Sequence, residues 1–278
     1  MTDRLAQVAR KDFFDSMREY QIYYVGVVFL LIALGIGYLV GTSPGSGAEI
    51  SPILAPAYLF LAPVAVLMLS HDAVAGKWAT GELTVMLGLP VSRFDVVYGS
   101  VIGRTAVVVT ATVVSIAVSV IVSTAMGVPP EVDTLAVVLS GLVAMILTFA
   151  SLAVAFSSLS KSTTISSSAA FGVFVLFVFQ LWSLVPGIID FALDRLGMGS
   201  LPEDAVGLWE NLPPYAAVRN VAVGVVGEPG EALGLFAPGY DAVNTPIYQT
   251  PVFAALVLAF WILVPVTLAY FRFSSADI

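Results

Sequence analysis

Residues 105–125 have the sequence TAVVVTATVVSIAVSVIVSTA, a run of 21 residues without a charged side chain. A helix of about 20 apolar residues is long enough to cross the hydrocarbon core of a bilayer. Five similar uncharged stretches lie near residues 22–40, 53–69, 135–156, 165–185 and 252–271. Backbone polar groups inside a bilayer must be hydrogen-bonded within the protein, which favours helices. The sequence therefore predicts an all-α integral membrane protein with six transmembrane helices.

The composition excludes several classes of protein and of site. Of the 278 residues, 59% are hydrophobic and only 11% are charged, whereas about 25% are charged in typical soluble domains. This argues against a cytosolic enzyme and against a nucleic-acid-binding protein. The chain has no cysteine and one histidine, His71, so it has neither a thiolate nor a multi-histidine metal site of its own. We expect no catalytic, metal-binding or cofactor-binding residue.

The lysines and arginines predict the orientation of the chain. Two of the 11 bases, Arg195 and Arg219, lie in the long segment 188–250. The other nine lie on the side of the two termini: Arg4, Arg10, Lys11, Arg18, Lys77, Arg93, Arg104, Lys161 and Arg272. Because cytoplasmic loops are enriched in Lys and Arg, we expect both termini in the cytoplasm. Residues 188–250 are then extracytoplasmic and too short for an independent domain, so they form a cap on one transmembrane domain, 1–278.

Residues 4–20 have the pattern of an amphipathic helix. Apolar residues recur at helical spacing on one side: Leu5, Val8, Ala9, Phe13, Met17 and Tyr20. Charged residues, among them Arg18, occupy the rest. The pattern predicts an interfacial helix on the inner membrane surface, with its apolar side on the lipids. The alternative is a solvated start to the first span.

The segment 70–103 predicts a second helix at the inner edge of the membrane. Gly81–Leu89 is a short apolar stretch that Pro90 ends. Ser92 and Asp95 have the spacing of a capping box, so a new helix begins there. If that helix continues to residue 125, it is about 50 Å long, longer than the ~30 Å hydrocarbon core. Leu83, Met86 and Leu87 have no cytosolic domain of this chain to cover them, so we expect them to be exposed.

Small residues mark positions where helices approach closely. They recur at four-residue spacing, which allows two helix backbones to come together in a membrane. The positions are Gly37 and Gly41, Gly99 and Gly103, and the stripe of Ser115, Ser119 and Ser123. We expect helix or subunit contacts at these residues.

The segment after residue 80 carries a recognisable pattern, gly-x-leu-x-x-met-leu-x-x-pro-x-ser-arg, followed by gly-x-x-x-gly. Its residues are Gly81, Glu82, Leu83, Met86, Leu87, Pro90, Ser92, Arg93, Gly99 and Gly103. This pattern resembles the inner-loop signature of the ABC type-2 transporter permease family, the membrane subunits of ATP-driven exporters. The leader helix and the short basic ending Tyr270–Phe273 are similar to those of the family as well, and so is the six-span layout.

The resemblance implies a permease in the plasma membrane that dimerises with a second copy or a paralogue. A separate ATP-binding-cassette subunit would bind ATP and Mg and dock on Gly81–Arg93, burying Leu83, Met86 and Leu87. Arg93 would pair with an acidic group of that subunit, or with Asp12 or Asp15. The chain has no G-x-x-x-x-G-K-[ST] motif, so we expect no ATP hydrolysis by this chain alone. Two alternatives stay open: an ATP-independent six-span channel or facilitator, and a membrane scaffold or assembly factor.

The predicted orientation is testable with topology reporters. A reporter fused after Ile278 should be cytoplasmic, and one inserted near Gly230 should be external, because of the asymmetry in Lys and Arg. Activity of an alkaline phosphatase fusion and of a fluorescent protein fusion at each position measures this. The reverse result at either position would contradict the six-span arrangement.

Overall fold

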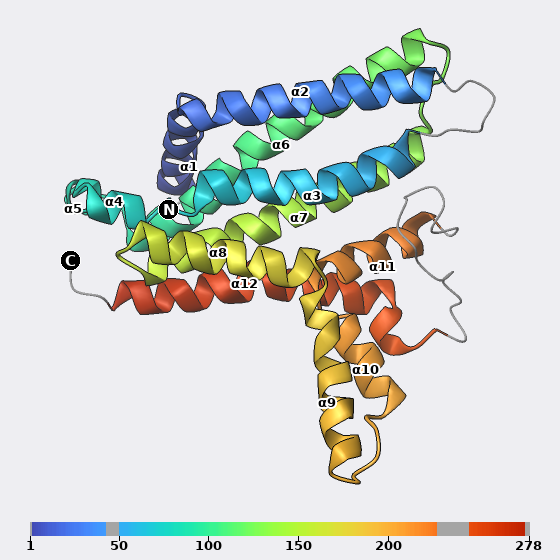
Figure 1. The fold of residues 1–278 in the computed structure, drawn as a ribbon. Coiled ribbons are helices and arrows are strands. Elements are labelled where there is room, and N and C mark those ends of the chain that lie inside the picture. The colour runs from blue at the N-terminus through green and yellow to red at the C-terminus, as the bar shows by residue number, and fades with distance from the viewer. Residues whose placement is uncertain (1, 43–49, 227–244, 276–278) are drawn as a thin grey trace.

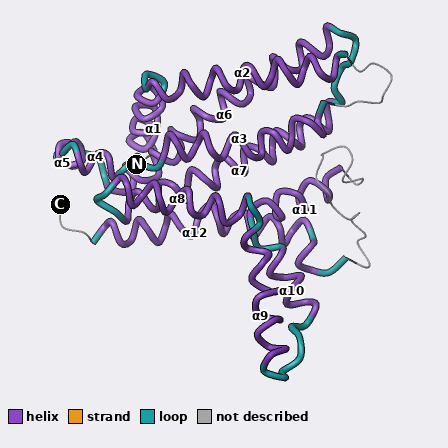
Figure 2. Tube along the Cα trace, viewed as in Figure 1, coloured by secondary structure: helices purple, strands orange, loops and turns teal. Residues whose placement is uncertain are grey.

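The computed structural model describes residues 2–42, 50–226 and 245–275 (Figure 1). Helices joined by loops make up these residues, and none of them forms a strand (Figure 2). Five helical segments are long and apolar enough to cross a membrane: α2 (Tyr20–Gly41), α3 (Ser51–Ser70, continued by α4 to Ala79), α6 (Arg93–Ala125), α7 (Val132–Leu159) and α12 (Pro251–Ser274). The all-helical membrane fold is therefore confirmed for the described residues.

The expected span over residues 165–185 is interrupted. Helix α8 (Thr163–Val178) ends early, and after a 3-10 turn (η1, Leu181–Ser183) the chain continues as α9 (Leu184–Arg195), bent by 65° from α8. The break lies at Gln180, whose φ of 54° is in the left-handed region, which cannot continue a right-handed helix. The prediction of one continuous helix here was wrong. The described residues contain five candidate spans, or six if α8 and α9 count as one.

Helix α7 is the centre of the bundle. It packs against α3, α6, α8, α11 (Pro214–Val226) and α12, and its side chains Met145, Ile146 and Phe149 are fully buried. Helices α2, α6 and α12 are less buried than α3 and α7 and keep one apolar side exposed, as expected for helices at the outside of a membrane bundle. Helix α11 is also held to the bundle, since the Tyr215 hydroxyl donates a hydrogen bond to the Leu59 carbonyl at 2.8 Å.

The two ends of the bundle differ. Helix α1 (Thr2–Ser16), α4 (Ala75–Ala79), α5 (Glu82–Leu87) and the end of α12 lie at one end, which we call the α1 end (Figure 1). Helices α9, α10 (Glu203–Glu210) and α11 lie toward the opposite end. Helix α1 stops at Ser16 rather than continuing to residue 20. Residues 227–244 of the predicted cap, and the reporter positions Gly230 and Ile278, are outside the described residues.

Glycines allow α6 to pack closely against α1 and α2. A methyl group on Gly99 would lie 2.7 Å from Val8 Cγ1 of α1, and one on Gly103 would lie 2.7 Å from the Ala9 carbonyl oxygen. On α2, a methyl on Gly37 would lie 2.6 Å from the Ser119 carbonyl oxygen. Three other small residues also lie at the α2–α6 contact. A methyl on Gly41 would meet Met126, and Ser119 is buried. Ser115 Oγ donates a hydrogen bond to the Phe29 carbonyl at 2.7 Å.

Two glycines of α2 provide a matched test of this packing. Gly37→Ala should be less stable than Gly35→Ala by about 1–3 kcal/mol, the usual cost of overpacking. The reason is that backbone of α6 blocks position 37, whereas nothing lies within 4 Å of position 35. Both variants gain the same helix propensity, about 1 kcal/mol, which cancels. Thermal unfolding of the purified protein in detergent measures the difference, and equal midpoints would contradict close α2–α6 packing.

Candidate coupling site

The first turns of α6 form the base of a polar cluster at the α1 end. The predicted capping box is confirmed: Ser92 Oγ accepts a hydrogen bond from the Asp95 amide at 3.1 Å, and the Ser92 amide donates to Asp95 Oδ2 at 2.9 Å. The expected long helix is confirmed as well, because α6 runs unbroken for 33 residues, about 50 Å. The part of α6 that exceeds the bilayer thickness is where α1 packs.

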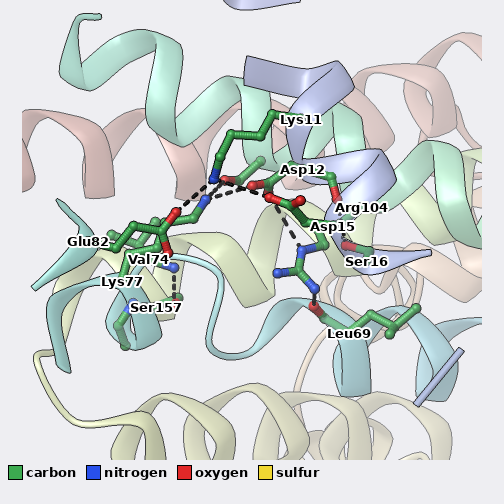
Figure 3. Close-up of polar contacts among 12 residues, drawn as sticks. Lys11, Asp12, Asp15, Ser16, Leu69, Val74, Lys77, Glu82, Arg104 and Ser157 are labelled. Atoms are coloured by element: carbon green, nitrogen blue, oxygen red, sulfur yellow. Dashed lines mark hydrogen bonds and ion pairs between the residues drawn. The ribbon is translucent and has the colours of Figure 1, made fainter. Parts of the chain in front are cut away.

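A buried carboxylate joins three segments at this place (Figure 3). Asp12 of α1 is only 2% exposed. Its Oδ1 lies 2.7 Å from Lys77 Nζ of α4, and its Oδ2 lies 3.6 Å from Arg104 Nε of α6. Lys77 also donates to Ser100 Oγ at 3.1 Å. All three charged side chains are buried, so this ion cluster is shielded from the water that weakens surface pairs.

The ionisation of Asp12 follows from its neighbours. Burial alone would raise the pKa of this carboxyl, but Lys77 and Arg104 favour its charged form more strongly and hold the pKa below its ordinary value. Asp12 is therefore a carboxylate at neutral pH. Two cations share it, so removing it would leave Lys77 without a counter-ion and Arg104 with only the more exposed Glu19.

Arg104 extends the cluster toward the spans. Its Nη1 lies 3.2 Å from Glu19 Oε1, just before α2, and also donates to the Leu69 carbonyl in the last turn of α3. Burial raises the pKa of Glu19, although Arg104 opposes this. One guanidinium thus contacts α1, the start of α2 and the end of α3.

A more exposed pair connects α5 to the same helix α1. Lys11 Nζ lies 2.7 Å from Glu82 Oε1 of α5 and 3.1 Å from Asp15 Oδ2 of its own helix. Burial would lower the pKa of Lys11, but the hydrogen bonds to Glu82 and Asp15 outweigh it and raise the pKa. The start of α4 is fixed to α7, because Ser157 Oγ of α7 accepts hydrogen bonds from the Val74 and Ala75 amides, both at 3.0 Å.

The apolar residues exposed in and after α5 are not the ones that the sequence predicted. Leu83 is completely buried in the chain's own core and Met86 is nearly so, while Leu87 packs half-buried against them. The expectation that Leu83 and Met86 are exposed was wrong, because the short helix turns them onto the bundle. The exposed apolar side chains are instead Val85 (69%) and Leu89 (58%). Gly81, with φ of 74°, precedes α5, and Pro90 lies exposed in the turn to α6.

Arg93 contacts neither Asp12 nor Asp15. Its Nη1 donates to the Phe273 carbonyl at 2.6 Å and to the Ser274 carbonyl at 2.8 Å, at the C-terminal end of α12. Free carbonyls and the negative end of the helix dipole attract a cation there. Arg93 therefore connects the start of α6 to the end of α12.

Helix α1 uses much of its apolar side for protein contacts. Val8 and Ala9 are buried against α6, Phe13 is half-buried, and Met17 and Arg18 are exposed. The central part of the side expected to lie on lipid therefore packs on α6. Sequence reasoning also missed the pairing of Asp12. The available signal was a carboxylate four residues after Val8, in the middle of the apolar side of the helix.

Substituting two aspartates of α1 tests the buried cluster and the surface pair separately. Asp12→Asn should destabilise the protein by about 3–5 kcal/mol, because it leaves Lys77 buried without a counter-ion and Arg104 with the more exposed Glu19 alone. Asp15→Asn, which removes only the exposed partner of Lys11, should cost less than about 1 kcal/mol. Thermal unfolding in detergent at neutral pH measures both, and equal losses would contradict the role given to Asp12.

The same cluster predicts a dependence on pH. Because the pKa of Asp12 is lower in the folded than in the unfolded chain, its stabilisation is complete above about pH 4, the ordinary pKa of an aspartate. It disappears as the pH falls through the folded-state value. The midpoint of wild type should therefore fall more steeply with acid than that of Asp12→Asn, and parallel curves would contradict this.

Comparison with known proteins identifies the family. The family model described as ABC-2 family transporter protein matches residues 6–278. Two curated relatives, each named probable ABC transporter permease protein NosY, are similar over part of their length. The one from Stutzerimonas stutzeri is 29% identical over 102 residues, 35% of this chain and 37% of that protein. The one from Pseudomonas aeruginosa is 27% identical over 112 residues, 38% and 41% respectively. The chain thus spans about two fifths of these relatives.

Because the family model covers nearly the whole chain, the protein belongs to the ABC-2 transporter family and is a membrane permease of that family.

Proposed function

We propose that this chain is the permease subunit of an ABC exporter in the plasma membrane, driven by a separate subunit that binds and hydrolyses Mg-ATP. The observation that carries the proposal is α5. This helix is anchored to the bundle on one side and exposes apolar side chains at the α1 end on the other. The names of the two relatives support the same assignment, since each is a probable ABC transporter permease.

The exposed edge of α5 suits a protein partner. Val85 belongs to α5 and Leu89 to the turn after it, and both are exposed. Figure 1 shows α5 projecting from the α1 end. Fully burying two such side chains is worth about 1.5–3 kcal/mol each. The charges nearby, on Lys11, Asp15 and Glu82, keep this end of the molecule hydrated, which favours a water-soluble subunit over lipid as the occupant.

The contacts on the anchored side of α5 connect this helix to the spans, so they can transmit a movement of α5. Leu83 fixes α5 to the core, Glu82 binds Lys11 of α1, and Lys77 of the preceding α4 binds Asp12. Arg104 carries the connection into α6, α2 and α3. Separating buried charges is costly, so a push on α5 would move α1 and α6 together. Closure of the partner on ATP would thereby reorient the spans.

We propose that the substrate path runs between two permease copies. The apolar cavity between α3, α7 and α11, lined by Ala55, Leu59, Leu142 and Val218 among others, has a volume of about 10 Å³, enough for about one water molecule. That cavity is too small to pass a substrate. A second copy or a paralogue would supply the other wall of the path.

Substitution of the exposed edge tests the proposal. Val85→Asp with Leu89→Asp should release an ATP-binding-cassette subunit that is produced together with this chain, because two charges replace the apolar contact. The control is Val132→Asp with Ile247→Asp, which changes two somewhat more exposed apolar residues (75% and 76%) at the opposite end. Co-purification in detergent and stimulated ATP hydrolysis are the measurements, with thermal unfolding to show that each variant is folded.

The outcomes distinguish the site from the function. Release by the first pair alone supports docking on α5. Retention by both pairs would place the contact elsewhere on the permease. Failure of the wild-type chain to bind the ATPase would contradict the exporter function and favour an ATP-independent channel or a scaffold.

A further inference from the structure

A proline inside α3 removes one of the backbone hydrogen bonds of this helix. Pro63 lies within α3 and is buried, and its nitrogen carries no hydrogen to donate to the Leu59 carbonyl four residues earlier. A buried carbonyl that is left without a donor costs free energy. A helix can also bend at such a position, because the hydrogen bond that would resist bending is absent. The Leu59 carbonyl therefore needs a donor from another part of the chain.

Tyr215 of α11 supplies that donor. Its hydroxyl donates a hydrogen bond to the Leu59 carbonyl at 2.8 Å, and Leu59 itself is only 6% exposed. The Tyr215 ring lies edge-on to the Phe149 ring of α7, with ring centroids 6.2 Å apart. The ring contact fixes the position of the side chain, and the hydroxyl replaces the hydrogen bond that Pro63 removes.

Helix α11 is itself fixed to the neighbouring span α12. Trp261 of α12 donates its indole N–H to the Leu212 carbonyl at 2.8 Å, just before α11 begins. Near the end of α11, a methyl group on Gly224 would lie against Pro251 at the start of α12. Figure 1 shows α11 running from the middle of the bundle toward the end opposite α1. Because both ends of α11 contact α12, α11 can hold α3 in place through Tyr215.

Apolar packing between α3 and α11 is loose beside this hydrogen bond. An apolar cavity lies there, lined by Ala55 and Leu59 of α3, by Val218 and Ala222 of α11 and by residues of α7. Atoms at the wall of a void lose dispersion contacts on that side. The contact of α11 with α3 at this place therefore depends strongly on the Tyr215 hydroxyl.

We propose that Tyr215 and Pro63 form a latch on α3. While the Tyr215 hydroxyl donates to the Leu59 carbonyl, the two halves of α3 keep one angle, and release of this hydrogen bond lets α3 bend at Pro63. Helix α3 is continued by α4, which carries Lys77 of the buried ion cluster. A push on α5 would reach Pro63 through α4, so the use of the latch during transport rests on the proposed function, whereas the latch itself does not.

A double-substitution cycle tests the latch. Tyr215→Phe removes the hydroxyl and keeps the ring contact with Phe149, so the Leu59 carbonyl loses its donor. Pro63→Ala restores a backbone amide that can donate to the same carbonyl, so the hydroxyl is then no longer required. Pro56→Ala is the matched control, because Pro56 lies in the same helix and the Tyr215 hydroxyl donates to Leu59 and not to the carbonyl that Pro56 leaves free.

Two measurements are made on the full chain in nanodiscs, without the ATPase subunit. Thermal unfolding gives the cost of each substitution. A pair of spin labels, at Ile53→Cys on α3 and Val252→Cys on α12, gives the distribution of distances between these helices at the end opposite α1. The natural sequence has no cysteine, so no other residue is labelled. A bend of α3 at Pro63 would move residue 53, which lies 10 residues, or about 15 Å, from the proline.

We expect Tyr215→Phe to lower the unfolding midpoint by about 2–4 °C or more and to widen the distance distribution. The same substitution should have little effect on either measurement in the Pro63→Ala chain, and its full effect in the Pro56→Ala chain. Equal effects in the two alanine chains would overturn the latch, and so would a Tyr215→Phe variant with an unchanged midpoint and distribution. Failure of the exporter function would leave these results as they are, because neither measurement requires ATP hydrolysis.

Discussion

The Asp12 carboxylate is the interaction on which the α1 end of the structure depends. Lys77 and Arg104 come from segments 27 residues apart in the sequence, and both are buried. Neither could stay buried as a cation without a counter-ion, because desolvation of an isolated charge costs several kcal/mol. Asp12 reaches them only because Gly99 and Gly103 allow α1 to approach α6 closely. The small residues and the buried charges are therefore parts of one arrangement.

The sequence predicted the features that the bilayer imposes. Charge-free runs locate the spans, since a charge in the hydrocarbon core is costly at any position. The start of α6 was predictable because Ser92 and Asp95 cap it locally, without help from the rest of the fold. The break after α8 was not predictable. Gln180 lies within an apolar run, and nothing in that run signals a residue with a left-handed backbone.

Sequence reasoning also did not predict which side of a short helix faces the bundle. In a helix of six residues such as α5, the apolar residues do not establish which side faces the bundle. Tertiary packing decided this, turning Leu83 inward and Val85 outward. Arg93 illustrates the same limit, since two of its hydrogen bonds go to carbonyls about 180 residues away, at the end of α12. A backbone carbonyl that accepts such a bond leaves no complementary side chain to find in the sequence.

Two helical segments project from the bundle, and different contacts hold them. Helix α5 and the turn after it combine exposed Val85 and Leu89 with half-exposed charges on Lys11 and Glu82. The ion pairs join α5 and α4 to α1 and α6 through charged groups that are costly to separate, as the proposed coupling requires. Helix α9 exposes Ile188 and Phe191, and the stack of Trp182 on Trp209 holds the start of α9 against the end of α10. Charged contacts therefore connect α5 to the spans, whereas aromatic contacts connect α9 to the neighbouring helix of its own hairpin.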